Sequence, residues 1–222
     1  MHYTLAVTGV LSLFGCTTAP SPTGPTAAAT VDARLMPEGF ESAFYREFVQ
    51  NAFDSPNHLE PIKLLRKPMR IYLRTEDESG HAIDAATQEL TEGVLRESAT
   101  IWSGETFGIL DVTRGTGTRE DVPGWITVKW SGVPMSGRCG RSTVGIDGGY
   151  IEFDASGACS CGLKTRVYPR LVRHELGHAM GYYHTGDPLD VMYGQSITPD
   201  ACDVMPSARE RQHAKIAHDR LP

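Results

Sequence analysis

Three histidines and one glutamate fall in a single short run of the chain, at His174, Glu175, His178 and His184. On a helix, His174 and His178 lie one turn apart on the same face, where two imidazoles could hold one zinc ion. Glu175 would project beside the metal and could take a proton from a metal-bound water. Gly181 is expected to end the helix in a left-handed turn, from which His184 returns as a third ligand. Three protein ligands leave a fourth position for water, as catalytic zinc requires.

The motif gains specificity from its length. Two histidines four residues apart also occur on the polar face of ordinary amphipathic helices. The addition of Gly181 and His184 at the required offsets argues against such a chance match. Met192 follows, with Tyr193 directly after it. The pattern H-E-x-x-H-x-x-G-x-x-H followed by a methionine turn resembles the metzincin metallopeptidases, and residues 184–193 are most similar to their matrixin branch.

The resemblance covers residues 174–193 and implies a fold, a cofactor and a substrate class. The implied fold is α+β, with a metzincin-like mixed, mostly parallel twisted sheet, a backing helix, a zinc-site helix and a small C-terminal subdomain with a closing helix. The implied cofactor is one catalytic Zn²⁺, with Glu175 as general base and a protein or peptide as substrate. Met192 is expected to form an apolar floor beneath the metal.

Other features of related enzymes are missing from this chain. Some metzincins carry a zinc-reaching tyrosine two residues after the methionine, but Gly194 stands there, so a structural role is expected for Tyr193. No His-x-Asp run of the kind that holds a second, structural zinc is present. Calcium is unsupported, because Asp147 and Asp154 beside a Gly-rich turn more often belong to an ordinary turn.

The remaining periodicities predict the elements around the motif. Aromatic residues at helical spacing over residues 40–53 indicate a helix, which we expect to pack on the domain rather than to occlude the cleft as a latency device. Asp84 is a candidate N-cap for a long helix over residues 83–102. In the strand at residues 69–74, Ile71 and Leu73 are expected on opposite faces. Further strands are predicted at 125–130 and 150–154, a loop at 131–149, the zinc helix at 168–181 and a closing helix at 206–218. The resemblance implies that the loop at 194–206 walls the substrate pocket.

Two of these elements carry functional expectations. By the resemblance, the strand at residues 150–154 is the sheet edge that borders the cleft, where an extended peptide could pair with free backbone groups. In the closing helix, His213 and His218 are expected on the solvated surface rather than as metal ligands.

The N-terminus has the form of an export signal. A short apolar stretch ends at Leu13-Phe14-Gly15-Cys16, which resembles a bacterial lipoprotein processing site and implies lipidation of Cys16. An ordinary signal peptide cleaved nearby is the alternative. We therefore expect a signal peptide at 1–15, a lipidated flexible tether at 16–37 rich in Thr, Ala, Pro and Ser, and one catalytic domain at 38–222. Thr17 after Cys16 favours the outer membrane if the organism is Gram-negative.

Export makes the other cysteines interpretable. Four remain besides the predicted lipidation site, and an even number in an oxidising compartment suggests two disulfides. Direct pairing of neighbouring Cys159 and Cys161 would be strained, so each is expected to reach Cys139 or Cys202. A second zinc site at Cys159 and Cys161 is the alternative, disfavoured because thiols outside the cell are usually oxidised.

Composition narrows the function classes. The chain has 222 residues with 40% apolar and 22% charged residues, which fits one domain of catalytic size plus a tail. Its formal net charge of −6 gives no basic footprint for nucleic acid. The sequence thus favours an exported zinc endopeptidase anchored to the cell envelope by lipid. The alternative, a non-catalytic binding lipoprotein on the same scaffold, is disfavoured because Glu175 and the three histidines are intact.

Overall fold

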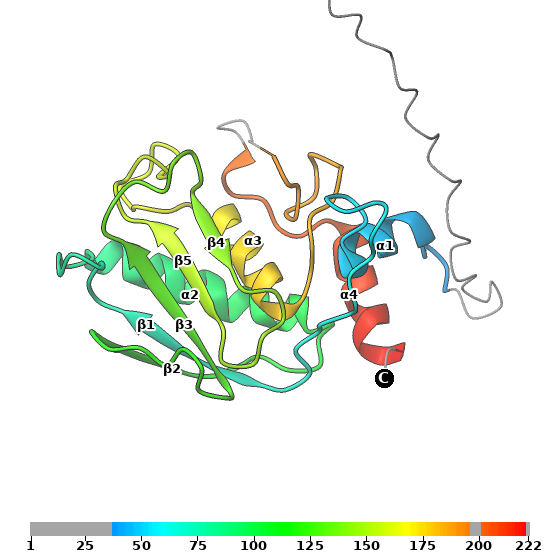
Figure 1. The fold of residues 1–222 in the computed structure, drawn as a ribbon, viewed down its shortest axis with the longest axis horizontal. Coiled ribbons are helices and arrows are strands. Elements are labelled where there is room, and N and C mark those ends of the chain that lie inside the picture. The colour runs from blue at the N-terminus through cyan, green and yellow to red at the C-terminus, as the bar shows by residue number, and fades with distance from the viewer. Residues whose placement is uncertain (1–36, 196–200, 221–222) are drawn as a thin grey trace, which may run out of the picture. The chain divides into compact units, whose positions relative to one another are not determined.

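The computed structural model describes residues 37–195 and 201–220, and within them one five-stranded sheet and four helices (Figure 1). The strand order is β2-β1-β3-β5-β4, with every neighbouring pair parallel except the antiparallel pair β4–β5. This confirms the expected mixed, mostly parallel sheet with its helices. The elements are α1 Ser42–Gln50, β1 Met69–Arg74, α2 Ala85–Trp102, β2 Ile109–Gly115, β3 Trp125–Ser131, β4 Gly140–Ser142, β5 Tyr150–Asp154, α3 Pro169–Met180 and α4 Ala208–Arg220.

The core lies between the sheet and the helices α2 and α3, which share one side of it in Figure 1. Alternate residues of the strands supply it, because side chains two apart on a strand share a face. Ile71 and Leu73 are therefore both fully buried in this core, and the expectation that they lie on opposite faces was wrong. The residues of the three central strands in the core are Met69, Ile71, Leu73, Ile126, Val128, Trp130, Ile151 and Phe153.

Local sequence signals determine where α2 begins and where α3 begins and ends. The carboxylate of Asp84 accepts a hydrogen bond from the backbone N–H of Thr87 at 2.8 Å, which caps α2 as predicted. Helix α3 begins with Pro169 at its first position, where the missing N–H costs nothing. It ends at Gly181, whose φ of 111° is left-handed, so the chain turns sharply after the two helical histidines.

Three features of the sheet differ from the expectation. Strand β2 was not predicted, because Ile109 and exposed Leu110 give it no clean alternation. Strand β4 lies inside residues 131–149, where only a loop was predicted. As a result β5 is not the edge: β4 pairs with it from Gly140↔Phe153 to Ser142↔Ile151 and forms the edge itself.

The closing helix is present, but its histidines are not on the surface. His213 is fully buried, and its Nε2 accepts a hydrogen bond from the backbone N–H of Glu41 at 2.8 Å, just before α1. His218 is half-buried, with its ring edge-on to Phe107. The expectation of solvated histidines was wrong, because α1 and the segment before it pack against α4 at His213, as Figure 1 shows, and Phe107 packs on His218.

Two disulfides are formed, Cys139–Cys159 and Cys161–Cys202. They confirm that Cys159 and Cys161 reach separate, distant partners and that neither is available as a zinc thiolate. Such bonds favour an extracytoplasmic compartment. The predicted signal at 1–15, Cys16 and the tether up to residue 36 lie outside the described residues. None of the helices in the part of the chain that the structure describes has the length and apolar character to cross a membrane.

Candidate metal centre

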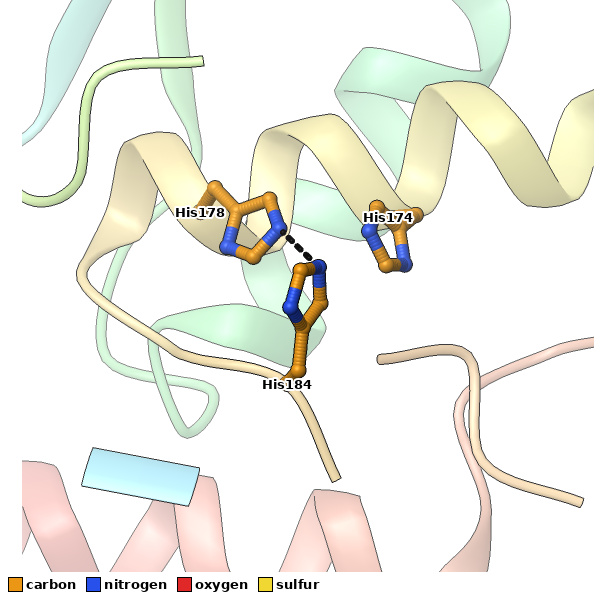
Figure 2. A group of neighbouring side chains, drawn as sticks. All are labelled: His174, His178 and His184. Carbon is orange, nitrogen blue, oxygen red and sulfur yellow. Dashed lines mark hydrogen bonds between the residues drawn. The ribbon is translucent and has the colours of Figure 1, made fainter. Parts of the chain in front are cut away.

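The three histidines of the motif converge on one point (Figure 2). His174 and His178 project from the same face of α3, and their ring centroids lie 4.7 Å apart. His184 returns from the segment after Gly181 and faces both, with ring centroids 5.3 Å from His174 and 4.7 Å from His178. One ring nitrogen from each residue lies within 4.8 Å of the others, which is the spacing of atoms that could share one metal ion.

Each ring is held through its other nitrogen. The Nδ1–H of His174 donates to the carbonyl of Val191, and that of His178 donates to the carbonyl of Tyr182, both at 2.8 Å. His184 Nδ1 lies 2.8 Å from a carboxylate oxygen of Asp54. Carbonyl and carboxylate oxygens only accept, so the proton of each neutral ring sits on Nδ1 and the lone pair on Nε2. This is the arrangement of metal-bound histidines.

A cation fits the point where the lone pairs meet. The Nε2 atoms of His178 and His184 lie only 3.1 Å apart, the contact drawn as a dashed line in Figure 2. With both Nδ1 atoms protonated, two lone pairs face one another there, and they repel unless a positive charge lies between them. Burial lowers the pKa of His174 to about 4 and that of His178 well below its ordinary value, so both are neutral at physiological pH.

Glu175 lies on the same helix beside the histidines and is almost fully buried. Its Oε2 has no hydrogen-bond partner among the residues that the structure describes, and Oε1 faces Gly140 of the edge strand so closely that a Cβ atom there would lie 2.6 Å from it. In the metal-free protein, burial raises the pKa of Glu175 to about 8. A buried, unpartnered carboxyl oxygen at a cluster of imidazoles is a group that can exchange a proton with a bound water.

Residues 190–193 form the methionine turn. Met192 is fully buried, and its sulfur lies directly against Gly177 of α3, where any side chain would collide with it. Gly194 packs just as closely on the ring of His184, since a Cβ atom there would lie 2.9 Å from Cγ of that ring. The hydroxyl of Tyr193 donates to Gln195 at 3.3 Å and makes no contact with the histidines that the structure records.

The methionine turn is supported from the closing helix. The carboxylate of buried Glu210 in α4 accepts the backbone N–H groups of Val191 at 3.0 Å and of Met192 at 2.8 Å. Arg170 of α3 donates to the carbonyl of Asp190 at 2.5 Å. Because the carbonyl of Val191 in turn holds His174, the orientation of that ring depends on α4 as well as on its own helix α3.

A cavity of about 800 Å³ opens over the histidines. Its walls include the edge strand β4, residues of α3 between Arg170 and His178, residues 193–195, and Asn51 and Asp54 after α1. On either side of β4, the N–H of Asp154 donates to the carbonyl of Cys139 and the N–H of Thr143 donates to the carbonyl of Tyr150. By the alternation of an antiparallel pair, Gly140 and Ser142 then direct their backbone N–H and C=O groups away from β5, toward the open side.

The structure thus brings together the three histidines and Glu175, packs Met192 against Gly177 of their helix, and places Tyr193 in the cavity wall. Asp147 and Asp154, considered for calcium, instead accept backbone N–H groups of Gly124 and of Met135 and Ser156. The sequence reading missed Asp54, Gly140 and Glu210. No local signal marks Asp54 or Gly140, because each acts on a residue far along the chain.

Comparisons with known proteins add little to this picture. No protein-family model matches the chain, and no curated protein matches it. Among solved structures, it is similar to metalloproteinase-II from Bacteroides fragilis, with a TM-score of 0.44 and 11% sequence identity over 70% of this chain and 54% of that one. The chain therefore spans about half the length of that protein.

Proposed function

We propose that the protein is an extracytoplasmic zinc-dependent endopeptidase. The observation that carries the proposal is the convergence of three imidazole nitrogens whose Nδ1 partners leave their Nε2 lone pairs aimed at one point. His174, His178 and His184 would hold the ion. Zinc bound by three imidazoles keeps a position open for water, lowers the pKa of that water toward neutrality and polarises a carbonyl group as a Lewis acid.

Residues of the chain would supply the general base and the structural contacts around the ion. Glu175 acts as general base, because its Oε2 is buried without a partner beside the histidines. It takes a proton from the attacking water and delivers it to the leaving amine. Met192 contributes a soft apolar floor under the histidines without ligating, and Tyr193 a structural contact in the wall.

The substrate backbone would bind along the edge strand β4. Gly140 and Ser142 offer outward backbone groups, and an extended peptide pairing with them would pass directly over Glu175, which lies against Gly140. The sequence predicted this role for β5, but the backbone groups on that side of β5 are already paired with β4. The substrate would be a protein or a peptide.

The two disulfides and the N-terminal sequence support the cellular placement. We propose that residues 1–15 are a signal peptide, that Cys16 carries lipid, that 16–37 tether the chain to the membrane and that 38–222 form the catalytic domain. A cell-envelope lipoprotein results, in the outer membrane if the organism is Gram-negative. Labelling of cells with an alkyne fatty acid should mark the wild type, and a Cys16→Ser variant should remain unlabelled.

The activity test combines metal content with turnover. The purified protein should contain one equivalent of zinc and cleave members of a peptide library, and a hydroxamate should inhibit it. The variant Glu175→Gln should keep its zinc and lose turnover, because the ligands are untouched while the base is removed. Turnover retained in that variant would overturn the general-base assignment.

The non-catalytic binding lipoprotein remains the second hypothesis. It predicts zinc at full occupancy with no cleavage of any peptide in the library. The buried Oε2 of Glu175, which no described residue hydrogen-bonds, favours the enzyme, because such a group is suited to exchange a proton with a bound water.

A further inference from the structure

The third histidine differs from the other two in what holds it. His174 and His178 are on a helix and donate to neutral backbone carbonyls. His184 is on an irregular segment, 29% of its side chain is exposed, and its Nδ1 partner is a carboxylate, that of Asp54 at 2.8 Å. The least constrained ring therefore has the only charged partner among the three.

Asp54 is positioned by the segment that follows α1. Helix α1 ends where Asn51 adopts a left-handed φ of 60°, and the N–H of Ser55 donates to the carbonyl of Asn51 at 2.9 Å. The turn closed in this way presents Asp54 to the cavity, with 45% of its side chain exposed.

Other contacts tie the same two segments together. The backbone N–H of Tyr183 donates to the carbonyl of Phe48 at 2.8 Å, immediately before His184. The N–H of Gly186, two residues after His184, donates to the carboxylate of Glu47 at 3.2 Å. The segment that carries His184 is thus attached to α1 on both sides of the ring, while Asp54 fixes the ring itself.

We infer that Asp54 is a positioning residue for metal binding, and that α1 with the turn after it is part of the metal centre rather than only a packing element. The inference rests on the proposed zinc site. Its physical basis is that a carboxylate accepting the Nδ1–H fixes the tautomer and rotation of the ring and makes its Nε2 a stronger donor to a cation. Without this contact, a ring on an irregular segment would lose its rotational freedom only when the metal binds, and that entropy loss would weaken metal binding.

The test measures zinc affinity rather than turnover. Zinc dissociation constants are determined at one pH by competition with a chromophoric chelator, for the wild type, Asp54→Asn and Asp54→Ala. Glu105→Gln is the matched control, since it removes one acid from an exposed position that does not line the cavity. Outer partners of ligating histidines are worth about 10–100-fold in metal affinity. We expect roughly tenfold weaker binding in Asp54→Asn, which can still accept the bond, and up to about 100-fold in Asp54→Ala.

Two further readouts separate positioning from a general structural role. The thermal unfolding midpoint of the metal-free variants should match that of the wild type, because Asp54 is half-exposed. The visible spectrum of the cobalt-substituted Asp54→Ala protein should differ from that of the wild type, as the geometry at the ion changes. An Asp54→Ala dissociation constant within twofold of the wild type would overturn the inference while leaving the zinc site standing. A wild type that binds no zinc would overturn the proposed function as well.

Discussion

Substitution of Gly140 by alanine tests how closely the edge strand and the proposed general base are fitted. A Cβ atom at this position would lie 2.6 Å from Oε1 of Glu175 and 2.9 Å from its Cγ and Cδ. The backbone of Gly140 is not in the left-handed region, so alanine adds a contact without straining the chain. The strand is held by its pairing with β5 and by the adjacent Cys139–Cys159 disulfide, so the side chain of Glu175 has to move.

The size of the effect follows from that displacement. Real Cβ contacts rarely fall under 3.4 Å, so the carboxylate must withdraw by the difference between 3.4 and 2.6 Å, about 0.8 Å. Misplacement of a catalytic group by about 1 Å costs roughly 100-fold in rate. We expect kcat of Gly140→Ala to fall by roughly 30–100-fold, with an overpacking cost of about 1–3 kcal/mol in stability. Zinc content should not change, because the Nδ1 partners of the histidines are unaffected.

The assay follows kcat and KM on a peptide that the wild type cleaves, together with metal content and urea unfolding. Gly93→Ala is the control: it makes the same chemical change in α2, where a Cβ atom meets nothing within 4 Å. That variant should keep full activity and gain about 0.5–1 kcal/mol of stability, since alanine is the better helix former. If Gly140→Ala turned over as fast as Gly93→Ala at equal zinc content, the reasoning about Glu175 would be refuted.

Two other predictions address stability. Replacing Cys139 and Cys159 together by serine should cost about 2–4 kcal/mol in urea unfolding without reductant, since their bond closes a loop with a sequence separation of 20; a cost near zero would contradict a bracing role. In the metal-free protein, burial raises the pKa of Glu175 from 4.5 to about 8, so the fold favours the protonated carboxyl. The stability of the wild type relative to Glu175→Gln should therefore fall as the pH rises from about 4.5 to about 8, and a difference that stays constant over this range would exclude the shift.

The parts of the site that the sequence predicted are those encoded by short spacing. His174 and His178 share a helical face because of the period of the α-helix, and Gly181 turns the chain because it can adopt a positive φ. The cap at Asp84 and the positions of β1, β3 and β5 along the chain follow from equally local patterns. Each of these needs only the residues within a turn or two, which is why they could be read without coordinates.

The parts that escaped prediction depend on partners far along the chain. Asp54 bonds a residue 130 positions away, and His213 accepts from Glu41 across 172 positions. Strand β4 has only three residues, Gly140–Ser142, too few for any alternation to show, and its presence moved β5 from the edge to the interior of the sheet. The reading of His213 as a surface residue failed because polarity in a sequence does not reveal a buried hydrogen-bond partner.

The Nδ1 partners of the histidines explain why the motif alone does not make the centre. His178 is oriented by a carbonyl near the end of its own helix, His174 by the methionine turn, which Glu210 of α4 holds, and His184 by Asp54 after α1. The first of these contacts forms with the helix, but the other two require both ends of the described chain to pack around it. The lone pairs therefore converge only in the folded molecule. An ion that binds them stabilises that fold relative to the unfolded chain, and relative to any state in which α1 or α4 has separated from the rest of the domain.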